Sequence, residues 1–192
     1  LAIPKKSVRE RVVDFSLGGD IPLAALLYGL YSVSLARPVA VAFEVDRFSV
    51  VTAAEVDDTL LADAPEGLRR LPWFDVNRVG IREPLNAEEY NQDLMLSLKG
   101  IEPSMRPNRW AADDAHEREK IRRGMKPLSA LAAMRNMTEA DILREADVKD
   151  TGEKRYYLPF TGSKEKGWIA VLDDHADFLG FAKIDGFAKA DK

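Results

Sequence analysis

The chain of 192 residues contains no cysteine and only two histidines, His116 and His175. Without cysteine, disulfide bonds and thiolate metal sites are excluded, while both reducing and oxidising compartments remain open. The sequence also has no Gly-rich nucleotide loop, no HExxH and no GxSxG motif, and no serine stands beside a histidine that could act as its base. The residues therefore predict no catalytic site and no cofactor.

Both histidines lie among acidic residues. His116 belongs to a mostly charged stretch, which is typical of a solvated helix surface. His175 lies in an acidic turn, 173–177, where carboxylates could collect around a cation. This turn lacks the glycine and the terminal glutamate of a calcium loop, and turns recruit Asp for conformational reasons. We therefore predict no metal site there.

The charge balance argues against a nucleic-acid partner. The net charge is −4, and residues 21–192 alone carry 24 basic and 29 acidic side chains, a net charge of −5. Binding to nucleic acid would call for a basic face instead. No cleavable signal peptide is visible, because the apolar run starts late and no small-residue cleavage pattern comes after it.

The longest uncharged run extends over sixteen residues, from Ile21 to Ala36. A bilayer core of about 30 Å needs roughly 17–25 apolar residues in a helix, so the run is close to a membrane span. Extending it back to Phe15 adds one charge, Asp20. Basic residues precede it, which would place its N-terminal side in the cytoplasm. These are Lys5, Lys6, Arg9 and Arg11.

A buried helix of a globular domain would have a similar composition. In that interpretation Asp20 caps the helix and Pro22 occupies its first turn. The residues alone leave both interpretations open. Because the chain begins at Leu1 rather than Met, we also expect it to be a piece of a longer protein.

The remainder predicts an α+β domain with a mostly antiparallel sheet and covering helices. Alternating apolar residues favour a strand over 39–51, or two strands bent near Asp46–Arg47, and further strands over 77–82, 155–160, 167–172 and 178–184. Capping patterns at Thr52–Glu55, Asn86 and Thr138–Asp141, together with composition, predict helices over 52–62, 87–98, 109–135 with an interruption near Gly124 and Pro127, and 139–146.

The aromatic residues divide between core and surface. We expect Trp168, Val171, Phe178 and Phe181 to contribute to the buried apolar surface of the C-terminal strands. Trp73 and Trp110 lie in Pro-rich irregular stretches, where an aromatic ring can also be an anchor for a partner.

Several phrases together resemble the type IV pilin accessory proteins of the TfpX/TfpZ family. The most distinctive covers the apolar run and the residues directly after it, LAALLYGLYSVSLARPVAVAFEVDRFSVVTAAEV. The basic stretch PKKSVRERVVDFSL and the terminal WIAVLDDHADFLGFAKIDGF are also similar. The chain departs from the family pattern at Gly18–Pro22, where the family helix is continuously apolar.

The resemblance implies an inner-membrane protein that assists or stabilises a cognate pilin in type IV pilus biogenesis, with no catalytic residues. It implies a basic cytoplasmic loop over 1–20, which ends a truncated membrane region, a transmembrane helix over 21–36 and a periplasmic domain over 37–192. Small residues let membrane helices approach closely. The candidate pilin contacts on the helix are Ala24, Ala25, Gly29 and Ser32, which could equally pack against other helices of the same protein.

Two alternatives remain at this stage. The first is a soluble protein-interaction module in which residues 21–36 form a buried core helix. The second is a periplasmic enzyme that uses the acidic turn at 173–177.

Overall fold

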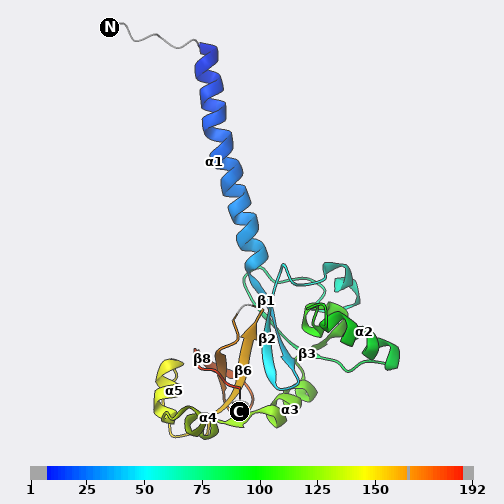
Figure 1. Cartoon of the computed structure of the whole chain (residues 1–192), viewed down its shortest axis with the longest axis vertical. Helices are drawn as coiled ribbons and strands as arrows, with labels where there is room; N and C mark the ends of the chain where they lie inside the picture. The colour runs from blue at the N-terminus through cyan, green and yellow to red at the C-terminus, as the bar shows by residue number, and fades with distance from the viewer. Residues whose placement is uncertain (1–7, 164, 188–192) are drawn as a thin grey trace. The chain divides into compact units, whose positions relative to one another are not determined.

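The computed structural model describes residues 8–163 and 165–187, with side chains described from Asp20 onward. The chain divides into two units, residues 1–37 and 38–192. The first contains one continuous helix, α1 (Val8–Ala36), which passes through Pro22 without a break (Figure 1). Asp20 therefore lies inside the helix and does not cap it.

The apolar side chains of α1 are exposed along the uncharged run. Leu23, Leu26 and Leu30 are each more than half exposed, and Tyr28 is 73% exposed. In the part of the chain that the structure describes, no helix combines the length and the apolar character of a membrane span.

The second unit is an α+β domain built on one mixed sheet. Its strand order is β4-β3-β1-β2-β6-β7-β8, with β5 paired to β6. Among the described residues, five of the seven strand pairings are antiparallel, and β1–β3 and β2–β6 are parallel. The strands are β1 (Pro38–Glu44), β2 (Arg47–Thr52), β3 (Asn77–Ile81), β4 (Trp110–Ala112), β5 (Lys126–Pro127), β6 (Tyr156–Gly162), β7 (Trp168–Leu172) and β8 (Phe178–Ala182).

Residues 39–51, for which the sequence left one long strand or two strands open, form two antiparallel strands. Glu44 pairs with Arg47, so the connection is a two-residue turn. Val45 adopts a left-handed φ of 53° in this turn and is almost fully exposed. The hairpin places β1 and β2 in the middle of the sheet.

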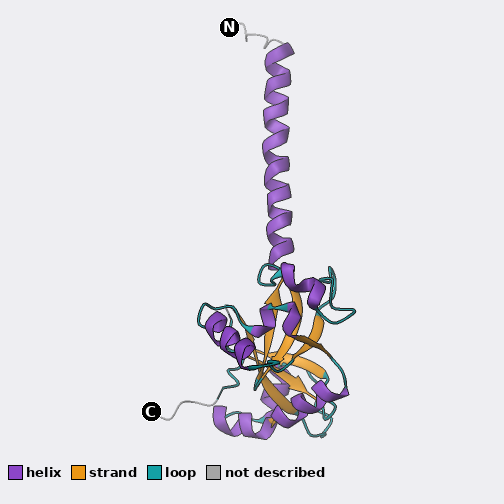
Figure 2. Cartoon of the chain, turned by 90° about the vertical axis from the view of Figure 1, so that its right-hand side faces the viewer, coloured by secondary structure: helices purple, strands orange, loops and turns teal. Residues whose placement is uncertain are grey.

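Helical segments lie around the strands (Figure 2). The α-helices are α2 (Ala87–Ser97), α3 (Ala115–Gly124), α4 (Leu128–Arg135) and α5 (Glu139–Glu145), and the 3₁₀ helices are η1 (Asp58–Asp63), η2 (Pro103–Met105) and η3 (Pro107–Arg109). The predicted capping box of Thr138 with Asp141 is present at the start of α5. The interruption near Gly124 and Pro127 is also present, since α3 ends at the first residue and α4 begins after the second.

Two predicted helical stretches are wrong. Thr52 and Glu55 do pair, since the Glu55 carboxylate accepts the Thr52 N–H at 2.8 Å, but they close a turn, and a 3₁₀ helix comes after it. Residues 110–112 form the edge strand β4 because they pair with Val79–Ile81. Long-range pairing there overrides a helix-favouring composition.

The predicted C-terminal strands are confirmed, and their four predicted core residues are buried to different degrees. Val171 is fully buried, whereas Trp168 and Phe178 are half-buried. Phe181 is 40% exposed, and its ring centroid lies 4.7 Å from that of Phe160. It therefore contributes to the buried apolar surface only in part.

Candidate functional site

Helix α2 turns an acidic face toward the domain. Its first turn is capped by Asn86, whose Oδ1 accepts the Glu89 N–H at 2.8 Å. The side chain that α2 buries is Asp93, which is 8% exposed. Glu89 lies one helical turn earlier, so both carboxylates occupy the same face. A surface helix normally buries an apolar stripe instead.

Three arginines form ion pairs with these two carboxylates. Arg82 comes directly after β3, and its Nη2 lies 2.7 Å from Oε1 of Glu89. Arg109, in η3, is 2% exposed, and its Nη1 lies 3.2 Å from Oε2 of Glu89 and 3.0 Å from Oδ2 of Asp93. Arg106 pairs with Oδ1 of Asp93. These ion pairs between two carboxylates and three arginines therefore attach α2 to the domain.

The ion pairs keep Glu89 charged. The pKa of Glu89 is lowered to about 2, first by the hydrogen bond from Arg82 and then by the backbone N–H of Leu85. The same bond to Glu89 raises the pKa of Arg82. Nη2 of Arg109 also donates to the Arg82 carbonyl at 2.7 Å. Removing one partner of such a buried network leaves an uncompensated charge behind.

The outer face of α2 is apolar. Tyr90, Leu94 and Leu98 recur at intervals of four residues and are all more than half exposed, and Met95 beside them is also exposed. We call these four residues the α2 apolar face. Contiguous apolar surface on a helix marks an interaction site more often than scattered exposed residues do.

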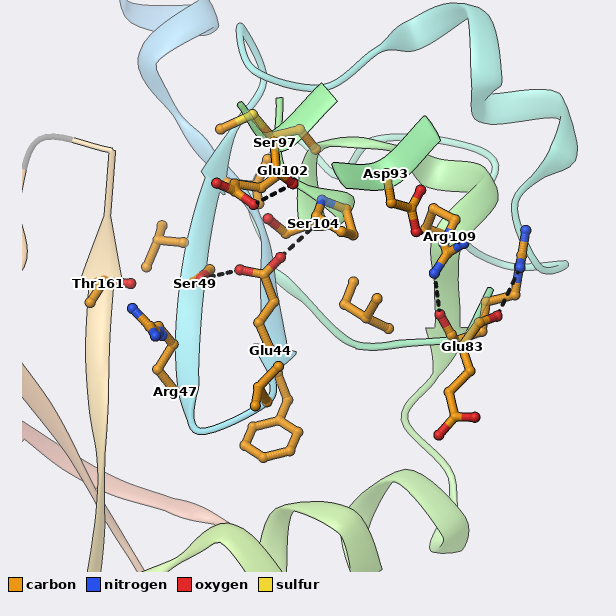
Figure 3. Close-up of a pocket in the computed structure, with 18 of the residues that line it drawn as sticks. Glu44, Arg47, Ser49, Glu83, Asp93, Ser97, Glu102, Ser104, Arg109 and Thr161 are labelled. Atoms are coloured by element: carbon orange, nitrogen blue, oxygen red, sulfur yellow. Dashed lines mark hydrogen bonds and ion pairs between the residues drawn. The ribbon is translucent and has the colours of Figure 1, made fainter. Parts of the chain in front are cut away.

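A cleft of about 1010 Å³ adjoins this face (Figure 3). Tyr90 and Leu94 line it, and the β1–β2 hairpin lines it with Glu44, Arg47 and Ser49. The volume is at the upper end of the range for ligand pockets. The cleft therefore has room for a protein segment, and part of the α2 apolar face belongs to its wall.

Glu44 lies within the cleft with both carboxylate oxygens engaged (Figure 3). Oε2 accepts the Ser49 hydroxyl at 2.6 Å, and Oε1 accepts the Ser104 N–H at 3.1 Å. These bonds tie the hairpin to η2. Glu44 therefore shapes the cleft, and its oxygens are already occupied by donors of the domain itself.

The acidic side chains of the predicted turn at 173–177 bind groups of the domain itself. Oδ1 of Asp173 accepts the N–H of His175 at 2.9 Å and that of Asp177 at 2.8 Å. Asp177 also pairs with Arg118 at 2.7 Å. Within residues 8–163 and 165–187, no group of three or more His, Cys, Asp or Glu side chains could hold a metal ion. His116 is exposed and donates its N–H to Asp114, near the start of α3.

A second charged network lies beside this turn. Arg118 contacts Asp113 at 2.9 Å as well as Asp177, and its pKa is raised chiefly by the bond to Asp113. The guanidinium of Arg78 lies 5.0 Å from the ring centroid of Phe178, and burial lowers its pKa. This network connects β3, α3 and the turn before β8, which is a structural role.

The candidate pilin contacts lie on α1 and are exposed. A Cβ added at Gly29 would meet no atom within 4 Å, and Ser32 donates its hydroxyl to the Tyr28 carbonyl at 2.8 Å. Ala24 and Ala25 are exposed as well. They belong to the first unit, whereas the cleft belongs to the second, and they remain predictions.

Trp110 is not a surface anchor. It is the first residue of β4, is 2% exposed, and donates its Nε1–H to the Ser104 carbonyl at 2.7 Å. Trp73, the other tryptophan for which we considered a partner, is 67% exposed. The α2 apolar face was not predicted, because the helix has both an acidic and an apolar face and the sequence does not show which of them is buried.

The fold and the site define an α+β domain with an exposed apolar helix face beside a wide cleft, an arrangement typical of protein-binding domains. The chain is similar to the serogroup I fimbrial assembly protein of Dichelobacter nodosus, with 32% identity over 97% of this chain and 73% of the relative. The serogroup E1 protein of the same organism gives the same identity and coverage. The chain therefore belongs to this family of fimbrial assembly proteins.

A third relative, the fimbrial assembly protein of serogroups C1 and C2, is 41% identical over 34% of this chain and 48% of its own length. No protein-family model matches the chain, and no solved structure matches it. The expected kinship with pilus biogenesis proteins is confirmed at the level of fimbrial assembly. None of these names specifies the TfpX/TfpZ family, which stays a prediction.

Proposed function

We propose that this protein is an accessory protein of type IV pilus biogenesis that assists or stabilises a cognate pilin without catalysing a reaction. The observation that carries the proposal is the similarity over 97% of the chain to proteins named for fimbrial assembly. The α2 apolar face supports it, because binding of another protein would remove that face from water. Co-purification with the cognate pilin is the direct test.

The proposed anchor is the helix over residues 21–36, in the inner membrane, with residues 1–20 in the cytoplasm and 37–192 in the periplasm. The sixteen uncharged residues support it, as do the exposed apolar side chains of α1. A reporter that works only in the periplasm should be active after Lys192 and inactive near Arg11. The opposite pattern, or recovery of the protein in the soluble fraction, would contradict the anchor.

The proposed docking site for the pilin is the α2 apolar face with the adjoining cleft. Replacing Leu94 by Glu puts a charge where the partner would bury an apolar side chain, which costs binding free energy. Leu94 is 52% exposed, so the fold itself should tolerate the change. We expect the L94E variant to retain its unfolding midpoint and to capture at least about tenfold less pilin, which is roughly 1.4 kcal/mol.

The matched control is Gln92→Glu, which adds the same charge at an exposed position of the same helix outside the apolar face. It should capture as much pilin as the unmodified protein. Equal capture by L94E and the control would disprove the docking site. If the unmodified protein captured no pilin, the accessory function itself would be wrong.

A further inference from the structure

Two aromatic side chains lie exposed in the loop before β3. Trp73 is 67% exposed, and Phe74 is fully exposed. The residues before the rings fix the loop to the domain, because Leu68 and Leu71 pack against the core cluster that contains Val39. The rings are therefore presented to the surroundings by a segment whose base is fixed in the core.

Strand pairing places this loop at one end of the sheet. Pro38, the first residue of β1, pairs with Thr52. Two residues later, Ala40 pairs in parallel with Asn77, the first residue of β3. Trp73 precedes Asn77 by four residues, which can span at most about 14 Å. The aromatic loop therefore lies near the end of the sheet at which β1 begins.

The same end of the sheet is joined to the apolar helix. Helix α1 ends at Ala36 and β1 begins at Pro38, so Arg37 alone separates them. Two residue steps span at most about 7 Å. A bilayer that surrounds the apolar run up to Ala36 therefore has this end of the sheet next to its surface.

We propose that the Trp73–Phe74 loop is a contact with the lipid bilayer, with both rings in the headgroup region on the periplasmic side. The inference rests on the proposed membrane anchor of the preceding section. Tryptophan favours this region because its ring is apolar while its N–H can bind water or headgroups. The contact would fix the orientation of the domain, and therefore that of the cleft, relative to the membrane.

The charges near the loop are of both signs, so the proposed membrane contact depends on the two aromatic rings and not on attraction to anionic lipid. Arg69 and Arg70 precede the loop, but Asp75 comes directly after the rings. The stretch before the arginines is acidic, with Glu55, Asp57, Asp58, Asp63 and Glu66. Anionic headgroups would repel these carboxylates. We therefore expect the contact in bilayers of zwitterionic phosphatidylcholine as well as in anionic ones.

The test uses the whole chain reconstituted into phosphatidylcholine vesicles whose acyl chains carry bromine close to the headgroup. Bromine quenches only tryptophans that touch the lipid. Trp73 is one of three tryptophans, Trp110 is buried and Trp168 is half-buried. We expect the brominated lipid to remove about a third of the emission, and the W73F variant to lose this quenching, because Phe keeps the apolar ring but not the fluorophore.

Flotation with the vesicles separates the two proposals. If the chain does not float with lipid, the membrane anchor fails and the loop contact with it. If it floats and its emission is not quenched, or if W73F is quenched as strongly as the unmodified chain, the loop does not touch lipid and the anchor stands. Protection of Trp73 from iodide without quenching by brominated lipid would show a protein contact instead and would overturn the inference.

Discussion

Nη1 of Arg109 lies 3.0 Å from Oδ2 of Asp93, and both side chains are buried. This contact attaches α2 to the domain by a charged face, so the apolar side chains of the helix remain outside. Buried ion pairs contribute little net stability compared with apolar packing, but a buried charge left without its partner is costly. We infer that the pair fixes which face of α2 is offered to a partner.

Replacing Asp93 by Ala should destabilise the domain strongly. The change leaves the guanidinium of Arg109 buried without this partner, and losing one member of a buried pair costs about 3–5 kcal/mol. The urea midpoint of the chain in detergent, measured by circular dichroism, reports the effect. Gln92→Ala on the exposed side of the same helix is the control and should change stability by less than about 0.5 kcal/mol. Equal midpoints for the two variants would show that the pair does not hold α2.

Stability should fall in acid because of Glu89. Its pKa is about 2 in the folded protein, against 4.5 as the reference value. Between these values the unfolded chain binds more protons, so stability rises with pH. The contribution of Glu89 is complete above about pH 4.5 and is lost as the pH falls toward about 2.

The E89Q variant isolates this contribution from that of other carboxylates. It should be less stable than the unmodified chain at pH 6, by about 1.5–3 kcal/mol, because hydrogen bonds to a charged group contribute that much. The difference should shrink as the pH approaches 2. Urea midpoints measured at both ends of this range check the prediction, and a difference that does not change with pH would contradict it.

Local patterns in the sequence predicted the elements whose stabilising contacts are local. Apolar alternation with a break near Asp46 gave two strands as one of two interpretations of β1 and β2, and α2 and α5 were indicated by their caps, Asn86 and Thr138. The antiparallel run of β6, β7 and β8 was indicated by short strands with polar turns between them. In each case a few neighbouring residues determine the structure.

Features that depend on distant residues could not be predicted. The parallel pairing of β1 with β3 brings together Ala40 and Asn77, and no local pattern indicates this neighbour. The orientation of α2 depends on Arg106 and Arg109, which come later in the sequence and lie in or beside 3₁₀ segments. Periodicity shows that the helix has two faces, but the location of the arginines decides that its charged face is the buried one.

Gly180 in β8 should not tolerate a larger residue. A Cβ added there would collide with the carbonyl oxygen of Ala146 and lie 2.7 Å from Cγ2 of Val148. The first of these neighbours is backbone at the end of α5, so Gly180→Ala must displace the helix, and overpacking of this kind costs about 1–3 kcal/mol. Gly167→Ala is the control, since no atom lies within 4 Å of its added Cβ. Thermal unfolding compares the two, and an unchanged Tm for Gly180→Ala would contradict the close approach.

The last prediction concerns the small residues of α1. If they contact the pilin in the membrane, leucines at Ala25 and Gly29 should hold the two helices apart and reduce pilin recovery, because close approach needs small side chains. The structure favours this test, since both positions are exposed and the space around Gly29 is open. The double variant A25L/G29L should therefore insert and fold normally.

The measurement is the amount of pilin that co-purifies with the double variant from detergent-extracted membranes. Leu26→Ala and Leu30→Ala serve as the control, because they change side-chain volume on the same helix without enlarging the small residues. We expect the double variant alone to lose pilin, while it remains in the membrane fraction at its usual level. If recovery is unchanged, the small residues do not contact the pilin, and docking must depend on the second unit, where L94E tests it separately. Since the two sites lie in different units, combining the variants also shows whether their effects on binding free energy add, as independent contacts should.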